Sequence, residues 1–257
     1  MLVQFFSQVG QETLAFLTRT GQLTRLALGS LYHSRSLNPR QMVKQMAHLG
    51  VNSLPIVLLT IFFTGMVITV QTAQEFIKYG AQSTIGGVVA ISMGRELSPV
   101  LTGVVVAGRV GAAITAEIGT MKVTEQVDAL RVMAVNPVAY LVVPRLWACV
   151  VMLPVLVIFA NAIGIAGSFL VTRFYEGITS VMFLNSIKTF AVPLDVAGGV
   201  IKAAFFGAII ALVGCYKGLN TAAGAEGVGK ATTESVVLSI ILIFAANYIL
   251  SIMIYST

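Results

Sequence analysis

Two adjacent ionisable residues, Arg95 and Glu96, lie inside a long apolar stretch of the sequence. Ionisable groups in such segments are costly, and they usually face the interior of a helix bundle or a water-filled cavity. Pro99 follows them, and a helical proline removes the hydrogen bond to the carbonyl four residues earlier, here that of Arg95. Lys202 lies at a comparable depth in a later apolar stretch and is a candidate partner of Glu96. These four residues indicate either a substrate pathway or an ion pair that holds helices together.

The composition is that of a membrane protein. Of the 257 residues, 57% are hydrophobic and only 10% are charged, and the mean hydropathy is +0.91. An ordinary soluble domain is about one quarter charged, so a soluble enzyme, a nucleic-acid-binding protein and a disordered chain are all disfavoured. The net charge of +6 is better explained by basic cytoplasmic loops than by a nucleic-acid partner. Cys149 and Cys215 show no metal-ligand spacing, and we expect neither a metal nor another cofactor.

The elements that position these residues are predicted to be helices only. A membrane-spanning helix needs roughly 20 mostly apolar residues. Five segments qualify, at about 53–74, 85–115, 146–172, 196–216 and 234–255. The preceding region, 1–48, alternates apolar with polar residues and is predicted to form an amphipathic helix in the membrane interface, the alternative being a loose cytoplasmic tail. The expected fold is therefore an all-α polytopic membrane protein, with a permease domain over 49–257.

Basic residues predict the orientation. With the N-terminus in the cytoplasm, the inside segments hold eleven of the sixteen Lys and Arg residues and the outside segments hold three. Because cytoplasmic loops carry the excess of positive charge, this orientation is favoured and the C-terminus is placed outside. The N-terminal residues resemble neither a signal peptide nor a transit peptide.

A polar segment, 117–143, separates the second and third predicted spans on the cytoplasmic side. Within it, apolar residues recur at helical spacing. The other faces carry Glu125, Gln126, Asp128 and Arg131. Such a helix suits docking into a groove of another protein, although the same pattern also describes a solvated interfacial connector.

Residues 224–231, GAEGVGKA, nearly match a phosphate-binding loop. Ala231 replaces the hydroxyl residue that binds Mg²⁺, and the segment follows an apolar span rather than a β-strand. We interpret it as a glycine-rich connection between spans, and we expect no nucleotide hydrolysis by this chain. His33 and His48 lie far from Glu96 in sequence, which disfavours an intramembrane enzyme.

One long run resembles the signature of the MlaE/YrbE permease family. It is GRVGAAITAEIGTMKVTEQVDALRVMAVNP, residues 108–137. Similar likenesses occur at MGRELSPVLTGVVVAGR (93–109), PRLWA (144–148) and GKATTESVV (229–237). The resemblance extends in order over the chain from about residue 40.

The resemblance implies a homodimeric permease of an ABC transporter, bound to a separate ATPase subunit and to an MCE-domain protein outside the membrane. It implies phospholipid or another hydrophobic lipid as cargo. Glu117 to Arg131 would correspond to the coupling helix, with Glu125 and Gln126 at its centre. Asn247 is a departure, since some relatives carry an acidic residue there. A bacterial inner membrane, Gram-negative or cyanobacterial, is implied, the alternative being the chloroplast inner envelope.

The residues and the resemblance together favour lipid transport by a non-hydrolytic permease subunit. Arg95 can bind a phosphate through its planar fork of N–H groups. Two rival functions remain open from the sequence. One is an ion- or proton-coupled carrier with Glu96 as the proton site, and the other is a membrane scaffold that transports nothing.

Overall fold

The chain folds into a bundle of long helices. The structure, a computed structural model, describes residues 2–36 and 39–256, and every regular element in these ranges is helical. Five helical runs in the described ranges are long and apolar enough to cross a membrane: Pro39–Lys78, Gln82–Val123, Val138–Phe174, Pro193–Leu219 and Gly224–Tyr255. The prediction of an all-α protein with five spans is confirmed.

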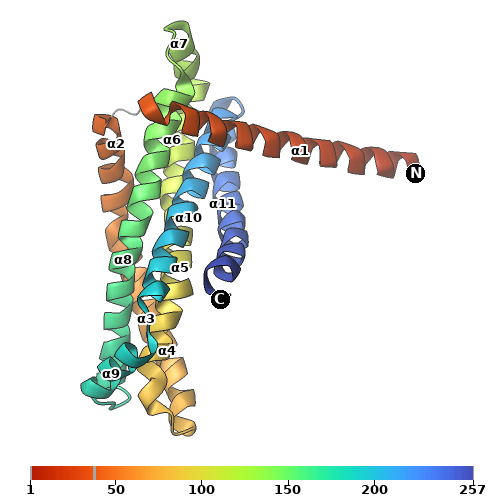
Figure 1. Cartoon of the computed structure of the whole chain (residues 1–257). Helices are drawn as coiled ribbons and strands as arrows, with labels where there is room; N and C mark the ends of the chain where they lie inside the picture. Colours follow the sequence, from red (N-terminus) through yellow and green to blue (C-terminus); the bar gives the residue numbers. More distant parts are fainter. Residues whose placement is uncertain (1, 37–38, 257) are drawn as a thin grey trace.

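Helix α1 (Leu2–Tyr32) lies across one end of the bundle and extends sideways beyond it (Figure 1). It is fastened by a hydrogen bond from the Tyr216 hydroxyl to the Gln22 side chain, at 3.0 Å. The Asn136 amide contacts the His33 ring at 3.1 Å. The interfacial placement expected for residues 1–48 stays a prediction, and the helical run that contains the first span begins at Pro39.

The first span starts with α2 (Pro39–Gln45) and ends with α3 (Leu54–Lys78). Between them lie a π-helical turn at Met46–Gly50 and a 3-10 turn at Val51–Ser53. The second span is a single run of three helices. These are α4 (Ile85–Ser92), α5 (Ser98–Val106) and α6 (Ala112–Val123), joined by π-helical turns at Met93–Leu97 and Ala107–Gly111. At 1.5 Å per residue, the 42 residues of Gln82–Val123 measure about 63 Å, twice the ~30 Å of a hydrocarbon core. This run therefore extends well beyond the membrane.

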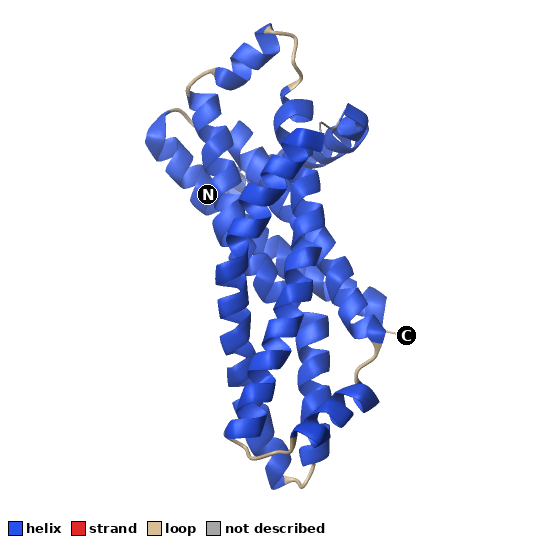
Figure 2. Cartoon of the chain, turned by 90° about the vertical axis from the view of Figure 1, so that its left-hand side faces the viewer, coloured by secondary structure: helices blue, strands red, loops and turns tan. Residues whose placement is uncertain are grey.

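The remaining helices distinguish the two ends of the bundle. Short α7 (Gln126–Val132) projects at the end where α1 lies, and α8 (Val143–Phe174) returns from there along the bundle. At the opposite end, α9 (Ser180–Phe190) packs beside the start of α4 (Figures 1 and 2). The last two spans are α10 (Pro193–Leu219) and α11 (Gly224–Tyr255). The sequence did not predict α9.

The glycine-rich segment 224–231 differs from the predicted connection. It forms the first two turns of α11, so that only residues 220–223 connect the last two spans. Gly224 has a φ of +84°, a conformation that glycine adopts without strain, and the helix starts directly from this turn.

Helix α11 contacts the bundle along one narrow ridge. Its buried residues are Ala231, Ser235, Ser239 and Ile243, spaced four apart. Side chains four apart lie on one face of a helix, so the ridge is a single line of contact. The other faces of α11 are apolar and exposed, as at Ile241, Phe244 and Tyr248.

Close backbone contacts between helices depend on glycine. Gly199 of α10 lies against the backbone carbonyl of Gly94, and a methyl group at Gly199 would overlap that oxygen. Small residues permit such close approach between membrane helices. This contact brings α10 next to the π-helical turn at Met93–Leu97, where Arg95 and Glu96 lie.

We predict that Gly199→Ala separates α10 from this turn. Forcing a methyl group into a filled site costs about 1–3 kcal/mol. The thermal unfolding midpoint of the purified protein in detergent should therefore fall. Gly108→Ala is the matched control, since nothing lies within 4 Å of the added methyl group. Equal midpoints for both variants would show that the Gly199 contact does not hold the helices together.

Candidate functional site

Four charged side chains from two helical runs meet near the α9 end of the bundle. Arg95 and Glu96 lie ten and eleven residues into the run that starts at Ile85, so that Arg95 is about 15 Å along it. Asp195 and Lys202 come from α10. Glu96 Oε1 lies 2.7 Å from Lys202 Nζ, and Asp195 Oδ1 lies 2.7 Å from Arg95 Nε. The predicted pairing of Glu96 with Lys202 is confirmed.

The Lys202 ammonium group is fully buried and fully used. Its side chain is 0% exposed. It donates to the Arg95 carbonyl at 2.9 Å, to Glu96 Oε1 at 2.7 Å and to Ser251 Oγ at 2.7 Å. The Arg95 carbonyl is available because Pro99, in α5, has no N–H to donate to it. An ammonium group has three N–H bonds. Lys202 therefore has none left for a ligand, and it lies behind Glu96 as a support.

Glu96 is held from two further positions on α11. Ser251 Oγ lies 2.8 Å from Glu96 Oε1, and the Asn247 amide donates to Glu96 Oε2 at 2.7 Å. The Glu96 side chain is 41% exposed. The neutral Asn247 thus serves as a donor to the carboxylate, a contact that a carboxylate at this position would not make unless it carried a proton.

Arg95 is the member of this group that faces outward. Its Nε binds Asp195, whose side chain is 1% exposed and whose other oxygen accepts the Val192 backbone N–H at 2.8 Å. The guanidinium carbon lies 4.5 Å from the centre of the Tyr255 ring. Among the described residues, neither terminal nitrogen of Arg95 has a hydrogen-bond partner, and the side chain is 37% exposed. Its outer edge is thus open to an anionic ligand.

The charges of this group balance. Two cations, Arg95 and Lys202, face two carboxylates, Glu96 and Asp195. Breaking a buried pair leaves an uncompensated charge, which is strongly destabilising. Within the described residues no three His, Cys, Asp or Glu side chains are placed to hold a metal ion. The arrangement suits binding of a phosphate or carboxylate.

Sequence reasoning missed three members of this group. Asp195 has the ordinary position of an acidic residue in the first turn of a helix. Ser251 and Tyr255 continue the four-residue spacing of the buried ridge of α11, as does Asn247. That spacing is visible in the sequence, so the ridge of small and polar residues could have identified both.

The predicted coupling residues fall into two groups. Glu117 lies in α6 and binds buried Arg145 of α8 at 2.9 Å. This pair joins two spans near the α1 end of the bundle. Glu117 is therefore placed in the bundle, apart from the other four residues around α7.

Around α7, charged side chains mostly bind one another. Asp128 receives hydrogen bonds from Lys122 at 2.8 Å and from Arg131 at 2.7 Å. The Lys122 hydrogen bond holds the pKa of Asp128 below its ordinary value, so this carboxylate stays ionised at neutral pH. The Gln126 amide donates to the Thr124 hydroxyl at 3.1 Å.

Glu125 separates α6 from α7. Its φ is +61°, in the left-handed region, and its side chain is exposed. The predicted amphipathic helix is for this reason divided at Glu125. Beyond it, Val127 is buried, whereas Val132 is 89% exposed and Met133 is also exposed. This apolar tip was not identified from the sequence, because its residues interrupt the helical period.

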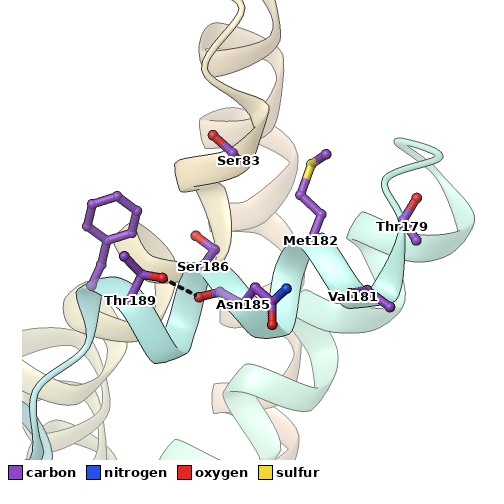
Figure 3. Close-up of a pocket in the computed structure, with 8 residues that line it drawn as sticks. Ser83, Thr179, Val181, Met182, Asn185, Ser186 and Thr189 are labelled. Carbon is purple, nitrogen blue, oxygen red and sulfur yellow. Dashed lines mark hydrogen bonds between the residues drawn. The ribbon is translucent and has the colours of Figure 1, made fainter.

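At the opposite end, α9 forms one wall of an open groove of about 620 Å³ (Figure 3). Ser83, before α4, and Met182 and Asn185 of α9 line it. The Gly87 backbone N–H donates to Ser186 Oγ at 2.9 Å, which fastens α9 to α4. This surface lies on the far side of the bundle from α1 and α7.

The comparisons with known proteins agree with this architecture. The family described as Permease MlaE matches residues 42–253. A probable ABC transporter permease protein of Synechocystis sp. is 49% identical over 215 residues, covering 84% of this chain and 82% of its own length. A probable ABC transporter permease protein of Rickettsia felis is 40% identical over 255 residues, 98% of each chain.

A plant protein is also similar. TRIGALACTOSYLDIACYLGLYCEROL 1, chloroplastic, from Arabidopsis thaliana is 42% identical over 212 residues, covering 82% of this chain and 61% of its own length. The family match and the bacterial relatives extend over nearly all the spanning runs. The chain therefore belongs to the MlaE family of ABC transporter permeases.

Proposed function

We propose that this chain is the membrane subunit that carries phospholipid, or a related lipid with an anionic headgroup, in an ABC transporter. The observation that carries the proposal is the open edge of Arg95. A guanidinium group presents its N–H groups as a planar fork, which matches the oxygens of a phosphate. In this structure Asp195 holds one side of the fork and leaves both terminal nitrogens free.

The surroundings of Arg95 suit a lipid. The C-terminal half of α11, whose ridge holds Glu96, exposes the apolar side chains of Tyr248, Ile249 and Ile252. A lipid with its phosphate on Arg95 would find hydrocarbon surface for its acyl chains beside it. The Arabidopsis relative is named after a glycerolipid, which supports a lipid cargo.

A homodimer would place this site between two protomers. Most of α11 is apolar and exposed, and it contacts the rest of the chain mainly along the ridge that runs from Ala231 to Tyr255. A second copy packed along α11 would cover this surface and bring two Arg95 side chains to one central cavity. We propose that the lipid passes through this cavity.

The two ends of the bundle suit two different protein partners. We propose that the exposed tip of α7, with Val132 and Met133 at its apex, docks into the ATPase subunit. Glu125, Gln126, Asp128 and Arg131 would surround the apex with polar contacts, and Glu117 would stiffen the base of the segment through Arg145. The groove beside α9 would receive the MCE-domain protein (Figure 3).

The membrane is proposed to be the inner membrane of a Gram-negative or cyanobacterial cell, since similar permeases occur in Synechocystis and Rickettsia. The chloroplast inner envelope is the alternative, given the chloroplastic relative. A proton-coupled carrier using Glu96 is less well supported, because the similar proteins bear the names of ABC transporter permeases.

The lipid site is tested with Arg95→Lys. Lysine keeps the positive charge beside Asp195 but loses the planar fork, so phospholipid that co-purifies with the complex, measured by mass spectrometry, should fall severalfold. Lipid transfer between vesicles should fall with it. Arg173→Lys, on an exposed arginine at the α9 end of α8, is the matched control and should change neither measurement.

Arg95→Ala extends this test. It should remove more lipid than Arg95→Lys while the dimer still elutes as one species. Unchanged lipid content and transfer in both variants would exclude Arg95 from the pathway. Loss of folding in both would favour the interpretation of the group as a structural ion pair.

Coupling is tested at the tip of α7. Val132→Asp should abolish co-purification of the ATPase subunit, because it places a charge at the centre of the proposed contact. Glu125→Gln keeps the shape of the turn and should weaken the association by less, within the ~2–5 kcal/mol that a truncated interfacial charge costs. Val181→Asp, on an exposed valine of α9, is the matched control. Equal ATPase recovery from all three variants would contradict docking at α7.

The orientation is tested with single cysteines in a chain that lacks Cys149 and Cys215. Thr124 and Asn185 are both exposed and lie at opposite ends of the bundle. A membrane-impermeant thiol reagent applied to spheroplasts should label Asn185→Cys and leave Thr124→Cys unlabelled until the membrane is opened. The reverse pattern would place α7 outside and overturn the assignment of both partners.

A further inference from the structure

A second cavity lies beneath α1, apart from the group around Arg95. Its volume is about 320 Å³, at the lower end of the ~300–1,000 Å³ of ligand pockets. It is lined by aliphatic and aromatic side chains, one of them a tryptophan: Ala27, Leu31, Leu146, Trp147, Val150, Ala204, Phe205, Ala208 and Leu212. Three helices, α1, α8 and α10, thus enclose an apolar space.

The other face of α1 borders a cavity of about 410 Å³ whose lining is mixed. Its polar residues are Gln22, Arg25, His33, Asn136, Tyr216 and Asn220, and Leu26, Val138 and Leu219 also line it. On α10, Tyr216 belongs to this mixed cavity and Leu212 to the wholly apolar one. Helix α1 therefore crosses α10 at the level where polar side chains give way to an apolar lining. That change marks the boundary between headgroups and acyl chains.

The apolar cavity opens towards the hydrocarbon side of this boundary. Phe205 and Leu31, on two of its walls, are 53% and 56% exposed. Trp147 lines the cavity with the carbon surface of its ring, and no polar atom is exposed inside the cavity. Such a space suits a hydrocarbon group such as an acyl chain.

Charge on α1 completes the match to a phospholipid. Arg25 is exposed on α1 and has no hydrogen-bond or ion-pair partner within the described ranges. It also lines an open groove along the side of α1 with Thr24, Leu28 and Tyr32. A phosphate near Arg25 would let an acyl chain pass over Leu28 into the cavity.

We propose that the cavity beneath α1 binds one acyl chain of a bilayer phospholipid, at a second lipid site distinct from the one at Arg95. The bound chain fills the space between α1, α8 and α10 and fastens α1 to the bilayer. This inference does not depend on what the chain transports, because it follows from the position and lining of the cavity and from the charge of Arg25 beside it.

Trp147 is the only tryptophan of the chain, so its fluorescence reports on this cavity directly. The full-length permease, purified in detergent, is titrated with phosphatidylglycerol brominated at the mid-chain double bonds of its oleoyl chains. Bromine quenches tryptophan on contact. We expect saturable quenching with one lipid per chain, reversed by the same lipid without bromine.

Two substitutions of alanine by phenylalanine distinguish lipid bound in the cavity from lipid that contacts the protein surface in general. Ala208→Phe fills the cavity and should reduce the affinity for the brominated lipid at least tenfold. Ala162→Phe adds the same ring on an exposed face of α8, outside the lining, and should leave the titration unchanged. Should Ala208→Phe fail to elute as a single species, Ala204→Leu makes a smaller filling and should weaken binding in the same direction.

Quenching that never saturates, or that is equal in the filled and control variants, would show only partition into the detergent micelle and would overturn the proposal. So would a dimer that dissociates in Ala208→Phe with unchanged quenching, because a second copy of the chain would then be the occupant. Lipid transfer can stay normal in Ala208→Phe without harm to the proposal, which separates its outcome from that of Arg95.

Discussion

A cation with no exposure to its surroundings must find all its partners inside the protein, and Lys202 does so with three hydrogen bonds. Without them a buried ammonium group would be strongly destabilising. The partners come from two helical runs, the Arg95 carbonyl and Glu96 from the second span and Ser251 from α11, so Lys202 ties α10 to both of them. The close contact of Gly199 with Gly94 allows α10 to approach near enough for these bonds to form. The Arg95 side chain can then face outward, because Lys202 holds both Glu96 and the Arg95 carbonyl from the opposite side.

The second span connects this group to the other end of the molecule. Its first π-helical turn carries Arg95 and Glu96, and its second carries Arg109, whose guanidinium group donates to the Asn52 carbonyl and to Ser53 Oγ. Further along, Glu117 binds Arg145 of α8. A movement of α7 would reach Arg95 along one continuous helical run, held to the first and third spans on the way. This gives the proposed ATPase contact a mechanical path to the proposed lipid site.

Much of the site was predictable because burial of charge is a strong constraint. Arg95, Glu96 and Lys202 stand out in apolar segments, and the pairing of Glu96 with Lys202 follows from their equal depth. Asp195 did not stand out, because an acidic residue at a helix start is common and its ion pair depends on tertiary packing. The roles of Ser251 and Tyr255 required knowing which face of α11 meets the bundle.

The fold was predictable to a similar degree. The five spans follow from apolar length alone, as the matching helical runs confirm. The ends of these spans do not follow from apolar length. Helix α2 is polar and the start of α11 at Gly224 is glycine-rich, and both are helical as extensions of long spans. The division at Glu125 depends on one left-handed residue that no periodicity reveals. Short α9 is amphipathic and packs on α4 through contacts far apart in sequence.

We propose that Lys202 supports the site while Arg95 binds the cargo. A cryo-electron-microscopy structure of the assembled transporter in phospholipid nanodiscs would test this division of roles most directly. We expect headgroup density within hydrogen-bond distance of the terminal nitrogens of Arg95, with Lys202 still bound to Glu96, Ser251 and the Arg95 carbonyl. Headgroup density on Lys202, or a lipid path that leaves Arg95 without a ligand, would contradict it.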